Sequence, residues 1–436
     1  MASKNKLARL TFSILSATAL LATAACGSSS GSTAGSSASS STDPAWSKKG
    51  PINYVQGKDT SGNVQKVIDK WNALHPDQKV TLIELSDNAD QQRASMIQNA
   101  QSKGASNYDV LSVDVVWTAE FAANGYLAQL PTSIDTSGYL KAAVDAATYF
   151  NKLYAFPSTS DGALLYYRKD LLDAAGLKPP TTWSEMKAAC AKVKTTDPTI
   201  DCYGGQFQKY EGLTCNFAEM VNSAGGQFLD ASGKPTVNSD AAIAGVQWAV
   251  DAFKDGTIPK AALTWQEEQS RQAFQDGKLV FLRNWPYVYS LANKTDGSSK
   301  VAGKFAVAPI PGLKGPGVST LGGHNMGIST YSQNKGTALE FVKWWNSPEN
   351  QKANTIATSN APTWTALYTD PELTSQFAYL PVLKASIDNA QARPKAVKYG
   401  DVTLAIQDAA YNALNGTTPP KAAMDDLETK LQALVK

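Results

Sequence analysis

The sequence supplies few groups for nucleophilic or metal chemistry. Histidine occurs only at His75 and His324. The motifs HExxH, GxSxG, GxGxxG and the Walker loop are absent from any context that would make them functional. No CxxC pair occurs, so a zinc site of that type has no support. A Ser-His-Asp triad would have to use His324, and nothing marks its nucleophile. We therefore expect no metal, no cofactor and no catalysis.

Acids and aromatic residues gather instead where strands should end. The segment FLRNWPYVYS, residues 281–290, is the densest case, with Trp285 and Tyr287 directly after an apolar run. Asp114 and Asp161 also lie beside expected strand ends, in VLSVDVVWTAEFA and FPSTSDGALLYY. Aromatic rings offer rigid apolar area and ionised acids accept strong hydrogen bonds, which together suit a sugar. The alternatives are core aromatics beneath a loop, and acids that serve as caps or turn residues.

Alternating strands and helices would position these side chains. Apolar runs predict strands at 52–55, 80–85, 109–113, 164–167, 279–282 and 305–308. Helical spacing predicts helices at 64–74, 90–101, 117–124, 168–176, 272–277 and 337–346, with another begun near Thr182 or Ser184. This alternation favours a mostly parallel sheet covered on both sides. Ligands bind such sheets at the carboxyl ends of strands, which puts Lys58, Asp59 and Asp114 near one rim.

The N-terminus has the layout of an export signal. Lys4, Lys6 and Arg9 precede a mostly apolar stretch, residues 10–25, which is short for a membrane span. Ala24, Ala25 and Cys26 resemble the lipobox of bacterial lipoproteins, in which the cysteine is lipidated, for example with palmitate, and the chain is cut before it. We expect a signal peptide at 1–25 and a Ser/Gly tether at 26–45. The alternative is an ordinary secretory signal with an incidental cysteine.

Composition limits the class of the remaining 411 residues. Removing residues 1–25 takes the formal net charge from +2 to −1, so no basic excess points to nucleic acid. The length predicts two domains or one large α/β body. No second apolar run approaches membrane length, so we expect contact with the membrane through the N-terminal lipid only.

Three further cysteines lie at 190, 202 and 215. Outside the cell a disulfide is permitted. Cys190 lies near the end of an expected helix and Cys202 follows the turn-rich TTDPTID, so we predict a Cys190–Cys202 bridge and a buried free thiol at Cys215. The alternative is three reduced, buried thiols.

Several motifs, in order along residues 50–436, resemble one family. They are DVLSVDVVWTAEFAANGYL, TSDGALLYYRKDLLDAAG, KYEGLTCNFAEMVNSAGG, KLVFLRNWPYVYSLA, KFAVAPIPG, LGGHNMGISTYSQNKGTALEFVKWW and ARPKAVKYGDV. The chain is similar to the family 1 extracellular solute-binding lipoproteins of ABC sugar importers, and most to their trehalose/maltose-binding branch.

This resemblance implies an α/β, two-lobe periplasmic-binding-protein-like fold of type II, with the ligand in a cleft between lobes joined by several chain crossings. One lobe would comprise residues 46–157 and 306–360, and the other 158–305 and 361–436. Crossings would lie near 156–159, 305–309 and 359–362.

The resemblance also implies a set of ligand-binding residues. Asp114 matches a first-lobe acid, Arg93 and Arg393 match basic cleft residues, and Trp285 with Tyr287 matches an aromatic pair. Thr159 and Asp161 match a tyrosine–aspartate pair, so Thr159 lacks a stacking ring. Gly323 and His324 fall in a turn where relatives carry Gly-Gly-Trp, so His324 adds a hydrogen-bonding group. The remaining expected positions, chosen from their loops, are Lys58, Asp59, Tyr210 and Glu211.

The sequence thus predicts a monomeric, lipid-anchored receptor on the outer face of the cell membrane. It would bind an α-linked glucose disaccharide, trehalose first and maltose next, and deliver it to the permease of an ABC transporter. An exported glycoside hydrolase using Asp114 and Asp161 is the main alternative. A surface lectin or adhesion protein is a third.

Overall fold

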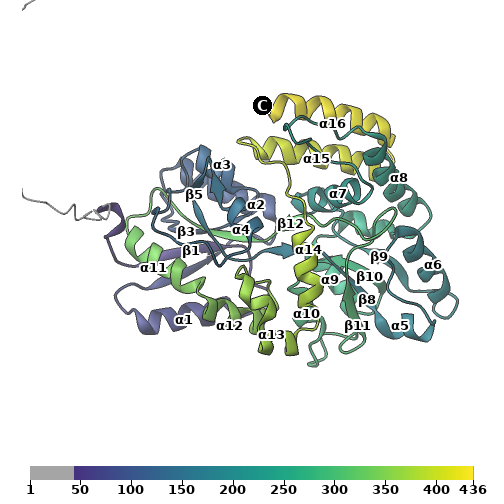
Figure 1. The fold of residues 1–436 in the computed structure, drawn as a ribbon, viewed down its shortest axis with the longest axis horizontal. Coiled ribbons are helices and arrows are strands. Elements are labelled where there is room, and N and C mark those ends of the chain that lie inside the picture. Colours follow the sequence, from purple (N-terminus) through teal and green to yellow (C-terminus); the bar gives the residue numbers. More distant parts are fainter. Residues whose placement is uncertain (1–43, 436) are drawn as a thin grey trace, which may run out of the picture. The chain divides into compact units, whose positions relative to one another are not determined.

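The computed structural model describes residues 44–435, and the expected signal peptide, Cys26 and most of the tether lie outside this range. Two sheets, side by side in Figure 1, form the framework. The first sheet has the order β2-β1-β3-β13-β6. Its strands are β1 (Ile52–Gln56), β2 (Val80–Glu84), β3 (Val110–Asp114), β6 (Ala155–Pro157) and β13 (His324–Ile328).

The first sheet is covered on both faces because its strands are apolar at successive positions. Tyr54 and Val110 face a cluster with α1 (Val64–Leu74) and α11 (Lys335–Trp345). Val55 and Leu111 face the other side, with α2 (Ala89–Gln101) and α3 (Thr118–Ala123). η1 (Pro44–Trp46) and α12 (Pro348–Thr358) both contact α11, and α4 (Lys141–Ala146) contacts β6.

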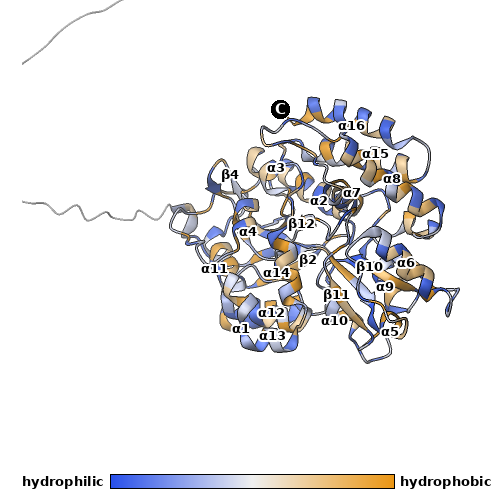
Figure 2. Cartoon of the chain, turned by 45° about the vertical axis from the view of Figure 1, so that its right-hand side comes forward, coloured by the Kyte–Doolittle hydropathy of each residue, from blue (hydrophilic) through white to orange (hydrophobic). Residues whose placement is uncertain are grey.

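The second sheet has the order β11-β8-β10-β9. Its strands are β8 (Leu164–Arg168), β9 (Asp201–Gly204), β10 (Leu279–Asn284) and β11 (Phe305–Ala308). Figure 2 shows β10 and β11 as largely hydrophobic and the outer helices α1 and α16 as mixed. Two further strand pairs are short: β7 (Asp161–Gly162) with β12 (Leu321–Gly322), and β4 (Thr148–Tyr149) with β5 (Lys152–Leu153).

Alternating residues of β8 pack in opposite directions. Leu165 and Tyr167 join the core formed with α6 (Trp183–Val193), α7 (Glu211–Ser223), α8 (Asp240–Lys254), α15 (Tyr399–Leu414) and α16 (Pro420–Leu434). Leu164 and Tyr166 join the core formed with α9 (Glu267–Gln275), α10 (Val288–Ala292) and α14 (Leu380–Asp388). The remaining helices are α5 (Lys169–Ala174), η2 (Lys260–Thr264), η3 (Thr365–Thr369) and α13 (Pro371–Gln376).

The expectation of mostly parallel sheets was wrong. β1 pairs in parallel with β2 and β3, and β10 with β9, but β13 runs antiparallel to β3 and β6, and β8 runs antiparallel to β10 and β11. A parallel neighbour needs a crossover that returns within the same sheet. β8 and β13 are instead entered by chain that arrives from the other sheet, so this constraint does not apply to them. β11 also pairs within the second sheet, although the predicted lobe boundary assigned residues 306–308 to the first lobe.

Local signals match several element ends. Thr182 caps α6 in a capping box with Glu185, and His75 follows the last residue of α1. A disulfide joins Cys190 near the end of α6 to Cys202 in β9, with a Cα–Cα distance of 5.4 Å. Cys215 is a buried free thiol. Within residues 44–435, no helix is long and apolar enough to cross a membrane.

We predict that the double variant Cys190→Ala, Cys202→Ala loses about 2–4 kcal/mol of unfolding free energy, because the bridge restricts the unfolded chain. Equilibrium denaturation with guanidinium measures this loss. Reductant should bring the native midpoint down to that of the variant and leave the variant unchanged. A native midpoint that does not respond to reductant would contradict the prediction.

Candidate functional site

The candidate site lies where β3 and β13 end beside each other. Asp114, the last residue of β3, is paired in register with His324, the first residue of β13. An Asp114 carboxylate oxygen also accepts a hydrogen bond from the backbone N–H of Val116, 3.0 Å away, which fixes the acid at the strand end. Burial lowers the pKa of His324 below its usual value, so its imidazole is neutral at pH 7 and can both donate and accept.

Arg393 joins this strand end to the second sheet's helices. Its guanidinium donates to Asp114 Oδ1 at 2.6 Å and Oδ2 at 3.1 Å, and to Glu211 Oε1 at 2.6 Å. Glu211 begins α7 and also accepts from the hydroxyls of Tyr399 and Thr403 on α15. Burial raises the pKa of Glu211, and the positive charge of Arg393 opposes that rise. The cation therefore bridges two acids that lie on different sheets' elements.

A tight turn holds His324 against the first crossing between the sheets. The backbone N–H of His324 donates to Thr159 Oγ1 at 2.9 Å, and the N–H of Thr159 donates back to the His324 carbonyl at 3.0 Å. Gly323 has φ of +107°, and a Cβ there would lie 2.2 Å from the Thr159 carbonyl oxygen. Only glycine fits this approach, so position 323 shapes the site through its lack of a side chain.

Asp161 and Trp285 meet across Gly322. A Cβ on Gly322 would lie 2.8 Å from the Trp285 ring and 3.4 Å from the Asp161 Cβ. Burial, reinforced by the charge of Asp114 and opposed by that of Arg283, raises the pKa of Asp161 to about 7. Among the described residues, none donates a hydrogen bond to the Asp161 carboxyl. An acid with free acceptors thus lies beside an aromatic ring.

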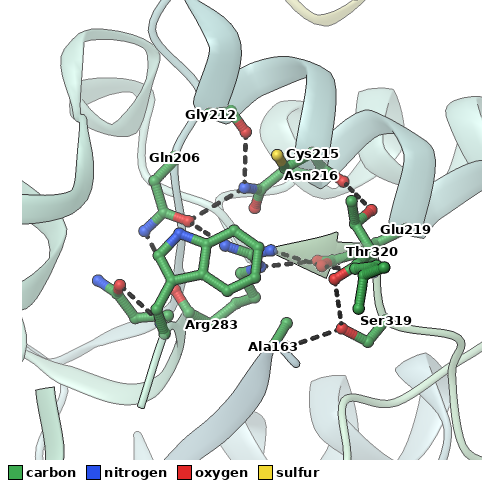
Figure 3. A network of polar contacts seen from close by, with 12 residues as sticks. Ala163, Gln206, Gly212, Cys215, Asn216, Glu219, Arg283, Ser319 and Thr320 are labelled. Carbon is green, nitrogen blue, oxygen red and sulfur yellow. Dashed lines mark hydrogen bonds and ion pairs between the residues drawn. The ribbon is translucent and has the colours of Figure 1, made fainter. Parts of the chain in front are cut away.

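A buried ionic network lies under Trp285. The Arg283 guanidinium carbon is 3.9 Å from the centre of the Trp285 ring, a cation–π geometry. Figure 3 shows Arg283 held by Glu219 and Gln206: its Nε donates to Glu219 at 2.7 Å and its Nη1 to Gln206 at 2.8 Å. Glu219 also accepts from the backbone N–H of Thr320 at 3.2 Å. The ring is therefore backed by a fixed cation tied to the segment that leads into Gly322.

Two other predicted residues donate hydrogen bonds to acids at the start of α9. Tyr287 donates its hydroxyl to Glu268, and Tyr210 donates to Glu267, each at 2.6 Å. The Tyr210 side chain is fully buried in the second sheet's surroundings. Its neighbour Glu211 is the residue of this loop that joins the cluster.

The predicted residues from the first strand-to-helix loop and from α2 also have local partners. Lys58 is exposed, and Asp59 accepts hydrogen bonds from Ser61 and from the backbone N–H of Val64, so it supports the start of α1. Arg93 makes a two-pronged ion pair with Glu120 and lines a cavity of about 420 Å³.

Three acid or basic residues were missed by the sequence prediction: Glu120, Glu219 and Arg283. Each is buried and ion-paired. The available signal was a charge inside an apolar run, as in VVWTAEFA for Glu120 and VFLRNW for Arg283, since charges are rarely buried unless paired. No group of three or more His, Cys, Asp or Glu in residues 44–435 is arranged to hold a metal ion.

Comparison with known proteins defines the class. Residues 57–352 match the family described as bacterial extracellular solute-binding protein, so the chain belongs to that family. A Deinococcus radiodurans protein described as a probable ABC transporter-binding protein is 34% identical over 380 residues, which cover 84% of this chain and 89% of the relative. The chain is thus related to the solute-binding components of ABC transporters.

Solved structures agree on the fold. Maltose-bound T. maritima MalE3 has a TM-score of 0.84 and 32% identity, covering 88% of this chain and 99% of its own. The GacH receptor of Streptomyces glaucescens has a TM-score of 0.80 and 24% identity, covering 89% and 98%. The two-lobe α/β architecture of binding proteins is therefore confirmed.

We predict that Asp161→Asn gains stability relative to the native protein as pH rises. The folded pKa of about 7 lies above the ordinary 3.8, so between these values the unfolded chain binds fewer protons and the native free energy of unfolding falls as pH rises. The asparagine variant lacks this loss, so the difference should grow by on the order of 3 kcal/mol from pH 4 to pH 8.

Denaturant titrations at several pH values measure this difference. The control is Asp135→Asn, in an exposed turn, which should track the native protein between pH 5 and pH 8. A constant offset between Asp161→Asn and the native protein would refute the assignment.

Proposed function

We propose that this protein captures an α-linked glucose disaccharide, trehalose first and maltose next, and presents it to the permease of an ABC importer. The observation that carries the proposal is the grouping of hydrogen-bonding acids, a buried arginine and an aromatic ring at one place. Asp114 and Arg393 supply charged partners for hydroxyls, and Trp285 supplies an apolar face beside the open carboxyl of Asp161. Sugars present both kinds of surface.

Closure of two lobes would couple capture to delivery. We assign residues 46–157 and 309–360 to one lobe and 158–308 and 361–436 to the other, because β11 pairs in the second sheet. Asp114 lies in the first lobe, while Glu211 and Trp285 lie in the second. A sugar that contacts both stabilises the closed arrangement over the open one. The 32% identity to maltose-bound MalE3 supports an α-glucoside as the ligand.

The alternative of an exported glycoside hydrolase would use Asp161, with its raised pKa, as the acid and Asp114 as its partner. Both oxygens of Asp114 accept hydrogen bonds from Arg393, which opposes a nucleophilic role. Membership of a binding-protein family also opposes it. We therefore propose that the sugar leaves the site unchanged.

A thermal-shift panel tests the ligand class. Trehalose, maltose, sucrose, cellobiose, glucose and a xylo-oligosaccharide are compared on the full chain, in a detergent without a sugar headgroup. We expect a rise of several degrees with trehalose or maltose alone, since ligand binding stabilises the folded state. Chromatography of the recovered sugar separates binding from hydrolysis. A folded, ligand-free sample that responds to none of these sugars would overturn the substrate class.

Trp285→Ala should weaken the Kd for the bound disaccharide at least tenfold, because it removes a buried aromatic contact. Asp114→Asn should do the same by removing a charged acceptor. Isothermal titration calorimetry measures both. The control Trp344→Ala removes a ring from the core beside α1 and should leave the Kd within twofold. Equal effects of the control and Trp285→Ala would rule out a ligand contact at Trp285.

We also propose that Cys26 anchors the chain to the outer face of the cell membrane through lipid, that the residues between Cys26 and η1 act as a tether, and that the receptor is a monomer. Cys26→Ser should abolish incorporation of labelled palmitate and release the protein into the medium. Unchanged membrane retention with no label in the native protein would contradict lipidation.

A further inference from the structure

A larger cavity lies outside the cluster of Asp114, Arg393 and Trp285. It measures about 780 Å³, within the range of ligand pockets. Elements attached to both sheets line it: α3, the end of α4 and the β4–β5 hairpin on one side, and residues 395–398 with the end of α16 on the other. Its polar and aromatic lining includes Asp145, Tyr149, Phe150, Asn151 and Lys398.

The hairpin in this lining breaks a local rule of turn chemistry. Phe150 and Asn151 form its two-residue turn with φ of +45° and +58°. Such turns favour asparagine and glycine, because a bulky side chain is strained at positive φ. Phe150 is nevertheless 80% exposed, and its ring meets that of Tyr149 edge-on at 4.6 Å. A strained, exposed aromatic residue at the mouth of a cavity is poorly explained by folding and points to binding.

One segment connects this cavity with the candidate site. Arg393 contacts Asp114, and two residues later Lys395 Nζ donates to the Asp145 carbonyl at 2.7 Å. Val397 and Lys398 then line both this cavity and the smaller one beside Arg93. Four residues of extended chain span at most about 14 Å, so the Cα atoms of Arg393 and Val397 are no farther apart than that. The segment that carries the site's arginine therefore goes on, from Lys395 to Lys398, to form one wall of this cavity.

We infer that this cavity is an outer subsite for further sugar units of an oligosaccharide whose first units occupy the candidate site. The inference rests on the proposed function. The rings of Tyr149 and Phe150 offer apolar faces to a sugar ring, and Asn151, Lys398 and Asp145 offer partners for its hydroxyls. Because the lining comes from both sides, an occupant would add contacts that favour closure.

The test compares malto-oligosaccharides of two to five units by calorimetry on the full chain in a detergent without a sugar headgroup. For the native protein we expect affinity to rise at least tenfold with length. Phe150→Asn removes the ring but tolerates the left-handed turn, so it should fold normally. This variant should keep the disaccharide Kd within twofold. Its gain in affinity with saccharide length should be at least fivefold smaller than that of the native protein. Leu74→Ala, which removes another exposed apolar group, on α1, should keep the gain.

The outcomes separate the two proposals. If the disaccharide binds but affinity does not rise with length, or Phe150→Asn keeps the full gain, the outer subsite is overturned and the proposed function stands. If no saccharide of any length binds the folded native protein, the proposed function is overturned and the subsite with it.

Discussion

The position of Arg393 between Asp114 and Glu211 is the constraint on which the site depends. A guanidinium taken out of water is tolerated only when its acidic partners are in place. Here one partner ends β3 of the first sheet and the other begins α7 beside the second. The hydrogen bond from Gln407 on α15 to Asp90 on α2 joins the same two groups of elements. Arg393 has both of its acidic partners only when the elements of the two sheets are close. The polar contacts of the site and the approach of the two sheets therefore depend on each other.

The aromatic side of the site depends on a second buried cation. Arg283 is fully buried in β10, where its guanidinium donates to Glu219 and Gln206 and lies against the Trp285 ring. Glu219, its partner, also accepts the backbone N–H of Thr320, on the path to Gly323. This links the ring after β10 to the turn before β13. Buried charges thus fix the positions of both the Trp285 ring and the turn that leads to the polar end of β13.

Much of the fold could be predicted from local pattern. The strand at Ile52–Gln56 and the helix at Val64–Leu74 follow from apolar spacing and from the turn residues between them. Strand direction could not be predicted, since β13 enters its sheet from elsewhere in the chain and no local residue records that. The site, too, could be predicted only where local residue patterns marked it. Asp114 and Asp161 were found from their place beside expected strand ends, whereas the Arg393–Asp114 contact joins residues 279 positions apart. Local residue patterns do not encode such a contact, so the family resemblance was needed to suggest Arg393.

The buried thiol of Cys215 has a consequence for how the chain matures. Cys190 and Cys202 are separated by 12 residues, and Cys202 and Cys215 by 13, so chain entropy barely distinguishes the two pairings. What distinguishes them is α7, which is buried from Glu211 to Asn222 and takes Cys215 into the core. Burial also raises the pKa of this thiol, which keeps it from the reactive thiolate form. In an oxidising exterior, the correct disulfide would then follow from the order of folding. Once α7 has packed into the core, the Cys215 thiol is no longer accessible, and Cys190 and Cys202 can pair only with each other.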